Sequence, residues 1–201
     1  MQNRGSKKLE FMQLVEFRKR LNIIIKLKGE KIMFFDENKM VMLEKELVEL
    51  LKAKKLTITT AESCTAGLVS ASIVNISGAS SVFKEGFITY CDEAKHDLLG
   101  ISNDTLDKYK AVSSQTAKEM AFGAAKKANA NVGIAVTGVA GPEKEDDKPV
   151  GLVYIGVYYN TGNFEILEAK EFNFAGDRQA IRYQAVENAF KLAIEYISIT
   201  T

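Results

Sequence analysis

The sequence predicts an α/β domain in which helices cover a mixed β-sheet. Segments with apolar residues spaced by three and four alternate with short segments rich in β-branched residues, which is typical of alternating helices and strands. Two of the expected strands are joined by the short polar turn 160–163, which indicates a hairpin. With 201 residues, 46% of them hydrophobic, the chain is long enough for one sizeable core.

The first half of the domain begins with a helix, because Leu43, Leu47 and Leu51 recur at helical spacing between Glu and Lys residues. A strand is expected over 56–61, where Thr and Ile alternate. The next elements, in order, are a buried helix over 66–74, a loop over 75–81, a strand over 83–91, a helix over 92–99 with Asp92 as N-cap and Gly100 at its end, and a short helix over 102–109.

The second half starts with a long helix over 114–128 and a strand over 132–137. A polar loop with an acidic centre follows, and two strands over 150–159 and 165–174 form the hairpin. Asp177 then caps a final helix that reaches about residue 197. No internal repeat and no second domain are indicated, so the domain is expected over 42–201.

The segment before this domain is strongly basic. Residues 1–32 carry nine Lys or Arg and three Glu, whereas residues 33–201 carry 18 basic and 23 acidic residues. We interpret 1–41 as a poorly ordered leader; a binding arm is the alternative. Lys28-Gly29-Glu30 can be encoded by a ribosome-binding sequence, and Met33 follows at a suitable distance. Our hypothesis is therefore that the native chain begins at Met33.

Composition also narrows the functional class. No apolar run approaches the roughly 18–20 residues of a membrane span, and no signal-peptide pattern is present, so a cytoplasmic protein without membrane contact is expected. The acidic balance of 33–201 argues against direct nucleic-acid binding. Cys64 and Cys91 are expected to be reduced thiols that pack as small buried residues.

Three polar segments follow predicted strands, where α/β sheets bind ligands. They are 61–67 (AESCTAG), 90–95 (YCDEAK) and 137–142 (TGVAGP). The first places free backbone N–H groups at a helix start, which suits an anion or an oxyanion. Glycines in the third allow close approach of a ligand to the backbone.

Elimination then narrows the chemistry. A serine triad needs a histidine, but the one histidine, His96, adjoins Lys95 and points about 100° away from it on a helix. Cys64, Cys91 and His96 lack the spacing of metal ligands. What remains is Ser63 activated by Lys95, with Tyr90 relaying the proton. On residues alone the bland alternatives stay open: Ser63 as an N-cap, Lys95 as a solvated helix charge and Tyr90 as a core residue.

Six motifs occur in an order that resembles a known family. They are TAESCTAG, FxxGFITYCDEAKHDLLG, AVS, AVTGVAGP, KPVGLVYIGV and FxGDRQAIRxxAV. Over residues 43–197 the chain is similar to the CinA C-terminal domain family, the nicotinamide mononucleotide (NMN) deamidases. The resemblance implies a three-layer α/β/α sandwich with a mixed, mostly parallel sheet, commonly a homodimer. It also implies hydrolysis of the NMN carboxamide to nicotinic acid mononucleotide and ammonia, with no metal or other cofactor.

The resemblance implies the catalytic residues as well, and the substrate contacts below are our hypothesis. Ser63, Tyr90 and Lys95 correspond to the catalytic residues. The expected substrate contacts are backbone N–H groups near Thr65, Ala66 and Gly67 for the oxyanion, Glu62 in the same motif, Thr137, Gly138 and Gly141 around the nucleotide, and Arg178 for the phosphate. A surface arginine paired with a carboxylate is the alternative for Arg178.

Three departures from the family pattern bear on specificity. Ala66 and Lys110 stand where the family usually has glycine, and the loop 143–148 is acidic where glycine is common. A methyl group at Ala66 would narrow the pocket if φ were positive. Two rival functions stay open: an amidase for another pyridine or nucleoside carboxamide, in which Cys64 is an alternative nucleophile, and a non-catalytic protein-binding module linked to competence or DNA damage.

Overall fold

The computed structural model describes residues 25–27, 30–32 and 37–199. The chain divides into two compact units, Met1–Lys39 and Met40–Thr201. In the first unit β1 (Ile25–Leu27) and β2 (Glu30–Ile32) form an antiparallel pair, which the sequence did not predict. The other expectations for the leader lie outside the described residues.

The second unit contains the predicted alternation of helices and strands. Its elements are α2 (Glu37–Lys54), β3 (Ile58–Glu62), α3 (Leu68–Val74), the short 3-10 helix η1 (Ala79–Ser81), β4 (Phe83–Ile88), α4 (Asp92–Leu99), α5 (Asn103–Tyr109), α6 (Ser114–Ala128), β5 (Val132–Gly138), β6 (Leu152–Asn160), β7 (Glu165–Asn173) and α7 (Arg178–Ser198).

The five strands form one mixed sheet in the order β4-β3-β5-β6-β7. β4, β3 and β5 are parallel neighbours, whereas β5–β6 and β6–β7 pair antiparallel. A mixed sheet is therefore confirmed. The sheet is not mostly parallel, however, because two strand pairs are parallel and two are antiparallel. The reason is that loops, not crossover helices, join β5 to β6 and β6 to β7.

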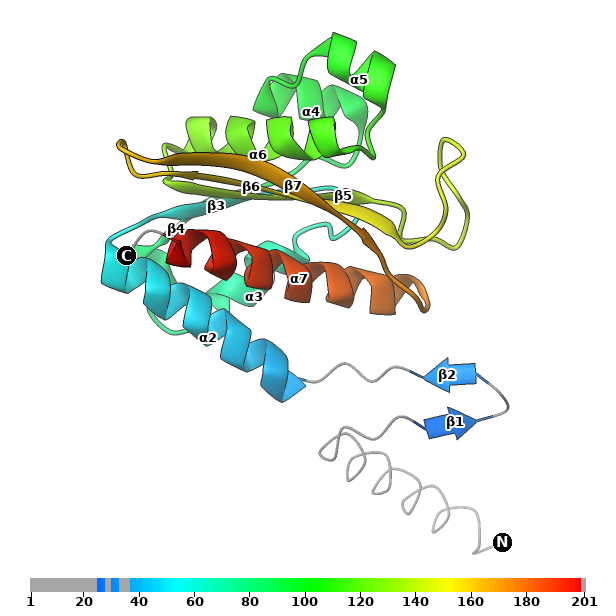
Figure 1. Cartoon of the computed structure of the whole chain (residues 1–201), viewed down its shortest axis with the longest axis horizontal. Helices are drawn as coiled ribbons and strands as arrows, with labels where there is room; N and C mark the ends of the chain where they lie inside the picture. Colours follow the sequence, from blue (N-terminus) through cyan, green and yellow to red (C-terminus); the bar gives the residue numbers. More distant parts are fainter. Residues whose placement is uncertain (1–24, 28–29, 33–36, 200–201) are drawn as a thin grey trace, which may run out of the picture. The chain divides into compact units, whose positions relative to one another are not determined.

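Helices cover both faces of the sheet, which confirms the three-layer α/β/α sandwich. Figure 1 shows α4, α5 and α6 on one face and α2, α3 and α7 on the other. Helix α6 approaches the centre of the sheet closely, because Gly133 and Gly156 leave room for it. A Cβ atom at these positions would lie 2.1 Å and 2.2 Å from the carbonyl oxygens of Ala121 and Ala117.

Side-chain caps account for the starts of three helices. Ser102, Ser113 and Asp177 accept hydrogen bonds from the backbone N–H groups of Thr105, Thr116 and Ala180. The prediction for α4 was wrong in detail: Cys91 is its N-cap and Asp92 its first helical residue. Strand β4 also ends at Ile88, before Cys91.

The carboxyl ends of β3, β4 and β5 meet at one edge of the sheet because these strands are parallel and adjacent. Ala61 is in register with both Phe87 and Ala135. The loops that follow the three strands, starting at Ser63, Thr89 and Val139, are consequently brought together.

Candidate active site

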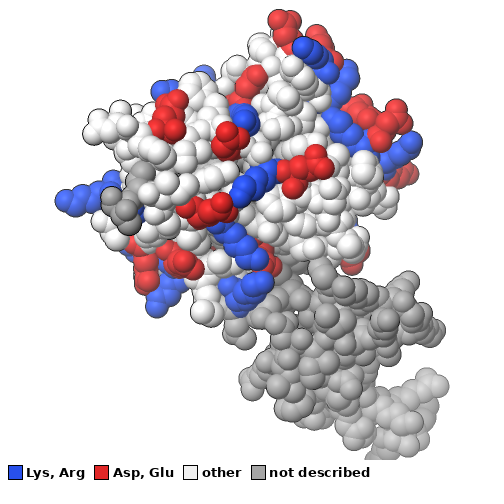
Figure 2. Space-filling view, in the orientation of Figure 1, with Lys and Arg blue, Asp and Glu red and all other residues white. Residues whose placement is uncertain are grey.

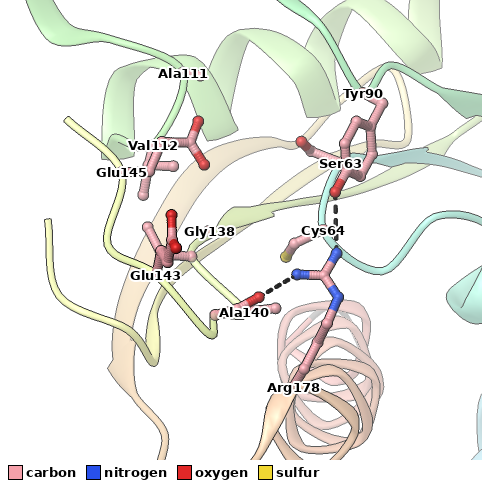
Figure 3. A pocket seen from close by; sticks show the side chains of 12 residues that line it. Ser63, Cys64, Tyr90, Ala111, Val112, Gly138, Ala140, Glu143, Glu145 and Arg178 are labelled. Carbon is pink, nitrogen blue, oxygen red and sulfur yellow. Dashed lines mark hydrogen bonds between the residues drawn. The ribbon is translucent and has the colours of Figure 1, made fainter.

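A pocket lies at this edge of the sheet, between loops from all three predicted motifs (Figure 3). Its lining includes a serine, a thiol, a phenol, an arginine and two carboxylates. The lining residues are Ser63, Cys64, Tyr90, Ala111, Val112, Gly138, Val139, Ala140, Gly141, Glu143, Glu145 and Arg178.

Ser63 is the first residue after β3 and is partly buried at the pocket. Its N–H donates to the carbonyl oxygen of Val136 at 2.9 Å, which ties the start of the loop to β5. Helix α3 begins five residues later and takes Gly67, not Ser63, as its N-cap. The N-cap alternative for Ser63 is therefore excluded, and its hydroxyl has no protein partner among the described residues.

Glu62 shapes the Ser63 loop from inside the protein. Its fully buried carboxylate accepts hydrogen bonds from the N–H groups of Gly67 (2.9 Å), Val69 (3.0 Å) and Ser70 (2.8 Å), and from the Ser70 hydroxyl (2.7 Å). Both oxygens are thus engaged within the loop and helix start. Glu62 does not line the pocket, so the structure places it as a loop anchor rather than as a substrate contact.

Two of the three expected oxyanion donors are already engaged. The N–H of Ala66 donates to the Ser63 carbonyl at 3.1 Å, and that of Gly67 donates to Glu62. The N–H group of Cys64 interacts only with its own thiol, and among the described residues the N–H group of Thr65 has no acceptor. These two groups, which directly follow Ser63, are better placed to hold an oxyanion than those of Ala66 and Gly67.

Ala66 adopts the left-handed backbone conformation, with the positive φ at which its methyl group was expected to narrow the pocket. φ is 49° at Ala66 and 91° at Gly67, so helix α3 starts at Leu68 rather than at residue 66. Lys110, the second departure from the family glycines, also has a positive φ of 68°. A glycine at either position would adopt this conformation without steric cost.

Tyr90 and Arg178 meet at the pocket (Figure 3). One guanidinium nitrogen of Arg178, Nη2, donates to the Tyr90 hydroxyl at 3.0 Å, and the other, Nη1, donates to the carbonyl oxygen of Gly141 at 2.5 Å. The Tyr90 side chain is 59% exposed, so it is not a core residue. Arg178 therefore links the loop after β4 to the loop after β5, and no carboxylate partner for it occurs in the described ranges.

Lys95 is buried rather than solvated, with 1% of its surface exposed. Its amine donates to the exposed Asp92 at 3.3 Å and does not line the pocket. The neighbouring His96 is exposed, and its Nδ1 lies 2.7 Å from the Ile101 carbonyl oxygen. The two side chains thus differ in burial, as the helical geometry predicts. Lys95 is nevertheless not one of the residues that line the pocket.

The TGVAGP segment contributes mostly backbone. Gly138 and Gly141 line the pocket, and a Cβ atom at Gly138 would lie 2.7 Å from the Leu152 carbonyl oxygen. Thr137 is fully buried and donates to the Ala111 carbonyl at 2.7 Å, which holds the connection before α6. Thr137 therefore supports the pocket wall without lining it.

The acidic loop turns two of its carboxylates toward the pocket. Glu143 and Glu145 are lining residues. Lys148 donates to the carbonyl oxygens of Tyr109 (3.2 Å) and Val112, which attaches the loop to the segment between α5 and α6. Partial burial lowers the pKa of Lys148. The acidic departure from the family pattern therefore places two carboxylates at the pocket.

The two thiols have different environments. Cys64 is buried, and this desolvation raises its pKa to about 12 despite the nearby charges of Arg182 and Arg178. Cys91 is exposed, so the expectation of a buried residue was wrong there. Both are free thiols, as predicted.

Arg182 is a site-supporting residue that sequence reasoning missed. Its Nη2 donates to the Thr65 carbonyl at 2.7 Å, and its buried Nε has no partner among the described residues. The available signal was its spacing of four from Arg178, which places both side chains on one face of α7. Helix α7 thus contacts three loops of the site through two arginines.

Comparisons with known proteins agree with this arrangement. A family model described as CinA C-terminal domain matches residues 40–197. A competence-damage inducible protein of Clostridium beijerinckii is 51% identical over 146 residues, which cover 72% of this chain and 35% of the relative. One from Clostridium botulinum (strain Kyoto) is 49% identical over 149 residues, 74% of this chain and 36% of that protein. The chain therefore spans about a third of the length of these curated relatives.

Solved structures match over nearly their whole length. The competence/damage inducible protein CihA from Agrobacterium tumefaciens has a TM-score of 0.75 at 35% identity, covering 81% of this chain and 98% of that one. The competence damage-inducible protein A from Klebsiella pneumoniae has a TM-score of 0.76 at 32% identity, covering 81% and 99%.

Proposed function

This chain belongs to the CinA C-terminal domain family, and on that premise we propose that it hydrolyses the carboxamide of NMN with Ser63 as the nucleophile. One observation carries the proposal: the Ser63 hydroxyl, which has no protein partner among the described residues, shares a pocket with Tyr90 and Arg178. The N–H groups of the next two residues donate to no other residue in the described part of the chain. These groups supply the nucleophile and the oxyanion donors of acyl transfer.

In the proposed reaction the Ser63 hydroxyl oxygen attacks the carboxamide carbon and gives up its proton. Tyr90 lines the pocket and Lys95 does not, so we assign Tyr90 the proton contact with Ser63 and Lys95 the base that this relay reaches. The N–H groups of Cys64 and Thr65 hold the oxyanion. Ammonia leaves with the proton, and water then hydrolyses the acyl-enzyme to nicotinic acid mononucleotide and regenerates Ser63.

Arg178 is the proposed phosphate contact. Its guanidinium now donates to two neutral oxygens, those of Tyr90 and Gly141. A phosphate is a stronger, charged acceptor that fits the same fork geometry. Gly138 and Gly141 leave room for the nucleotide against the backbone.

The test is ammonia release from NMN by wild type, Ser63→Ala and the control Ser80→Ala, which changes an exposed serine in η1. Release by wild type and the control is expected, with Ser63→Ala slower by about a thousandfold or more, as for other lost nucleophiles. Equal melting temperatures would show that the fold is kept. Full activity of Ser63→Ala, or no release by wild type, would reject the proposal.

The family resemblance also implies a homodimer, which we keep as part of the proposal. Sedimentation equilibrium of the purified chain measures it directly. A purely protein-binding role in competence or DNA damage would gain support if wild type bound NMN no better than unrelated nucleotides.

A further inference from the structure

The acidic loop forms one wall of the proposed active-site pocket. Figure 3 shows Glu143 and Glu145 on the side of the pocket opposite Tyr90 and Arg178. The backbone N–H groups and carbonyls of Glu145 and Lys148 pair with each other, which closes the loop as a turn. Glu145 thus belongs to a hydrogen-bonded turn that Lys148 attaches to the Val112 segment, and Glu143 lies two residues before it.

The lysines of this loop form no ion pair with the wall, although the charge of Lys148 lies close enough to Glu145 to interact with it. Lys144 pairs with Asp147 at 3.1 Å, and Lys148 donates to backbone carbonyls. In the described part of the chain, neither Glu143 nor Glu145 has an ion-pair partner. The negative charge of the wall is therefore available to a ligand.

The remaining surfaces of the pocket carry no competing negative charge. Cys64 lines the pocket as a 5% exposed thiol, and burial keeps it protonated because its pKa is raised to about 12. Arg178 supplies a positive charge on the far side. The pocket thus separates a cationic side from an anionic wall, with Ser63 as its nucleophile.

We infer that Glu143 and Glu145 are specificity-determining residues that select a ligand with a positively charged ring. The identity of the ring rests on the proposed function: NMN carries a pyridinium cation at the ring and an anionic phosphate. Such a zwitterion matches both sides of the pocket. In this arrangement the acidic wall does not repel the phosphate of the substrate, because the wall faces the cationic ring and Arg178 binds the phosphate.

The experiment compares NMN with reduced NMN, which has the same ribose and phosphate but an uncharged dihydropyridine ring. Affinities are measured by titration calorimetry on Ser63→Ala protein, so that hydrolysis does not interfere. The two variants are Glu143→Gln/Glu145→Gln and the control Asp146→Asn. Asp146 lies in the same loop outside the pocket lining, and Asn tolerates its φ of 47°.

We expect NMN to bind about tenfold more tightly than reduced NMN, the size of one partly solvated charge interaction. The double variant should bring this ratio close to one without weakening reduced NMN, whereas Asp146→Asn keeps the ratio. A damaged pocket would weaken both ligands, so the affinity of reduced NMN serves as the internal control.

An unchanged ratio in the double variant, or an equal change in Asp146→Asn, would overturn the inference. The proposed function fails separately: cation preference without ammonia release by wild type would reject the deamidase and leave the charge selection standing. Ammonia release with equal binding of both nucleotides would reject the charge selection alone. Absence of binding by either nucleotide would reject both.

Discussion

Ser63 and Cys64 are neighbours at the pocket with opposite chemical properties. Ser63 is partly exposed to the cavity, and its hydroxyl is free of protein partners in the described ranges. Cys64 is 5% exposed, and desolvation opposes its ionisation. A thiol acts as a nucleophile through its thiolate. Because burial disfavours the thiolate of Cys64, it argues against Cys64 as the alternative nucleophile.

Iodoacetamide should therefore distinguish the two cysteines. At pH 8 we expect labelling of the exposed Cys91 and not of Cys64, with ammonia release retained, because the Cys64 pKa is raised to about 12 and its thiolate fraction increases only as pH approaches that value. Peptide mass mapping at several pH values measures this. Inactivation that follows Cys64 labelling at pH 8 and is absent in Cys64→Ala would contradict it.

At the scale of elements, the turn between β3 and α3 is the most constrained part of the site. The N–H groups of Gly67 and of two residues at the start of α3 converge on the buried Glu62 carboxylate, and Arg182 donates to the Thr65 carbonyl. Within this turn Ala66 and Gly67 adopt left-handed conformations. A non-glycine residue pays a steric cost there that the rest of the turn offsets.

Replacing Ala66 with glycine should stabilise the protein by about 1 kcal/mol, because it removes the methyl group from a left-handed residue. The matched control is Ala71→Gly in helix α3, which should destabilise by about 1 kcal/mol since glycine is unfavourable within a helix. Urea unfolding measures both free energies. Two changes of the same sign would show that φ at Ala66 is not the controlling factor.

At the scale of the whole molecule, the candidate site belongs to one compact unit. Every lining residue lies between Ser63 and Arg178, inside the unit Met40–Thr201. On the face shown in Figure 2, basic and acidic side chains are interspersed. Over the described ranges no helix combines the length and apolarity of a membrane span.

A chain that starts at Met33 should therefore retain the kcat/KM for NMN and the melting temperature of the full chain. The reason is that the lining residues named above lie between Ser63 and Arg178 and that the family match covers 40–197. Kinetics and thermal unfolding of both chains measure this. A several-fold loss of activity in the shorter chain would assign the basic segment a role.

Within the unit Met40–Thr201 the sequence by itself determined the α-helices, the five strands and the three loops that meet at the sheet edge. Local patterns suffice there: caps such as Ser102 and Asp177 and the hairpin turn act on adjacent residues. Elimination and the family resemblance selected Ser63 and Tyr90, and charge and fork geometry selected Arg178; the structure brings the three into one pocket.

Only the tertiary structure decided what each side chain faces. The sequence predicts Glu62 as a substrate contact, but its carboxylate accepts hydrogen bonds from backbone N–H groups inside the protein. Lys95 is buried and does not line the pocket. Arg182, on α7, contacts the carbonyl of Thr65, which is far away in the sequence. The acidic wall, formed by Glu143 and Glu145, lines the same pocket as Ser63, which is also distant in sequence. Direction, burial and partner depend on contacts between distant segments, which spacing along one chain does not encode.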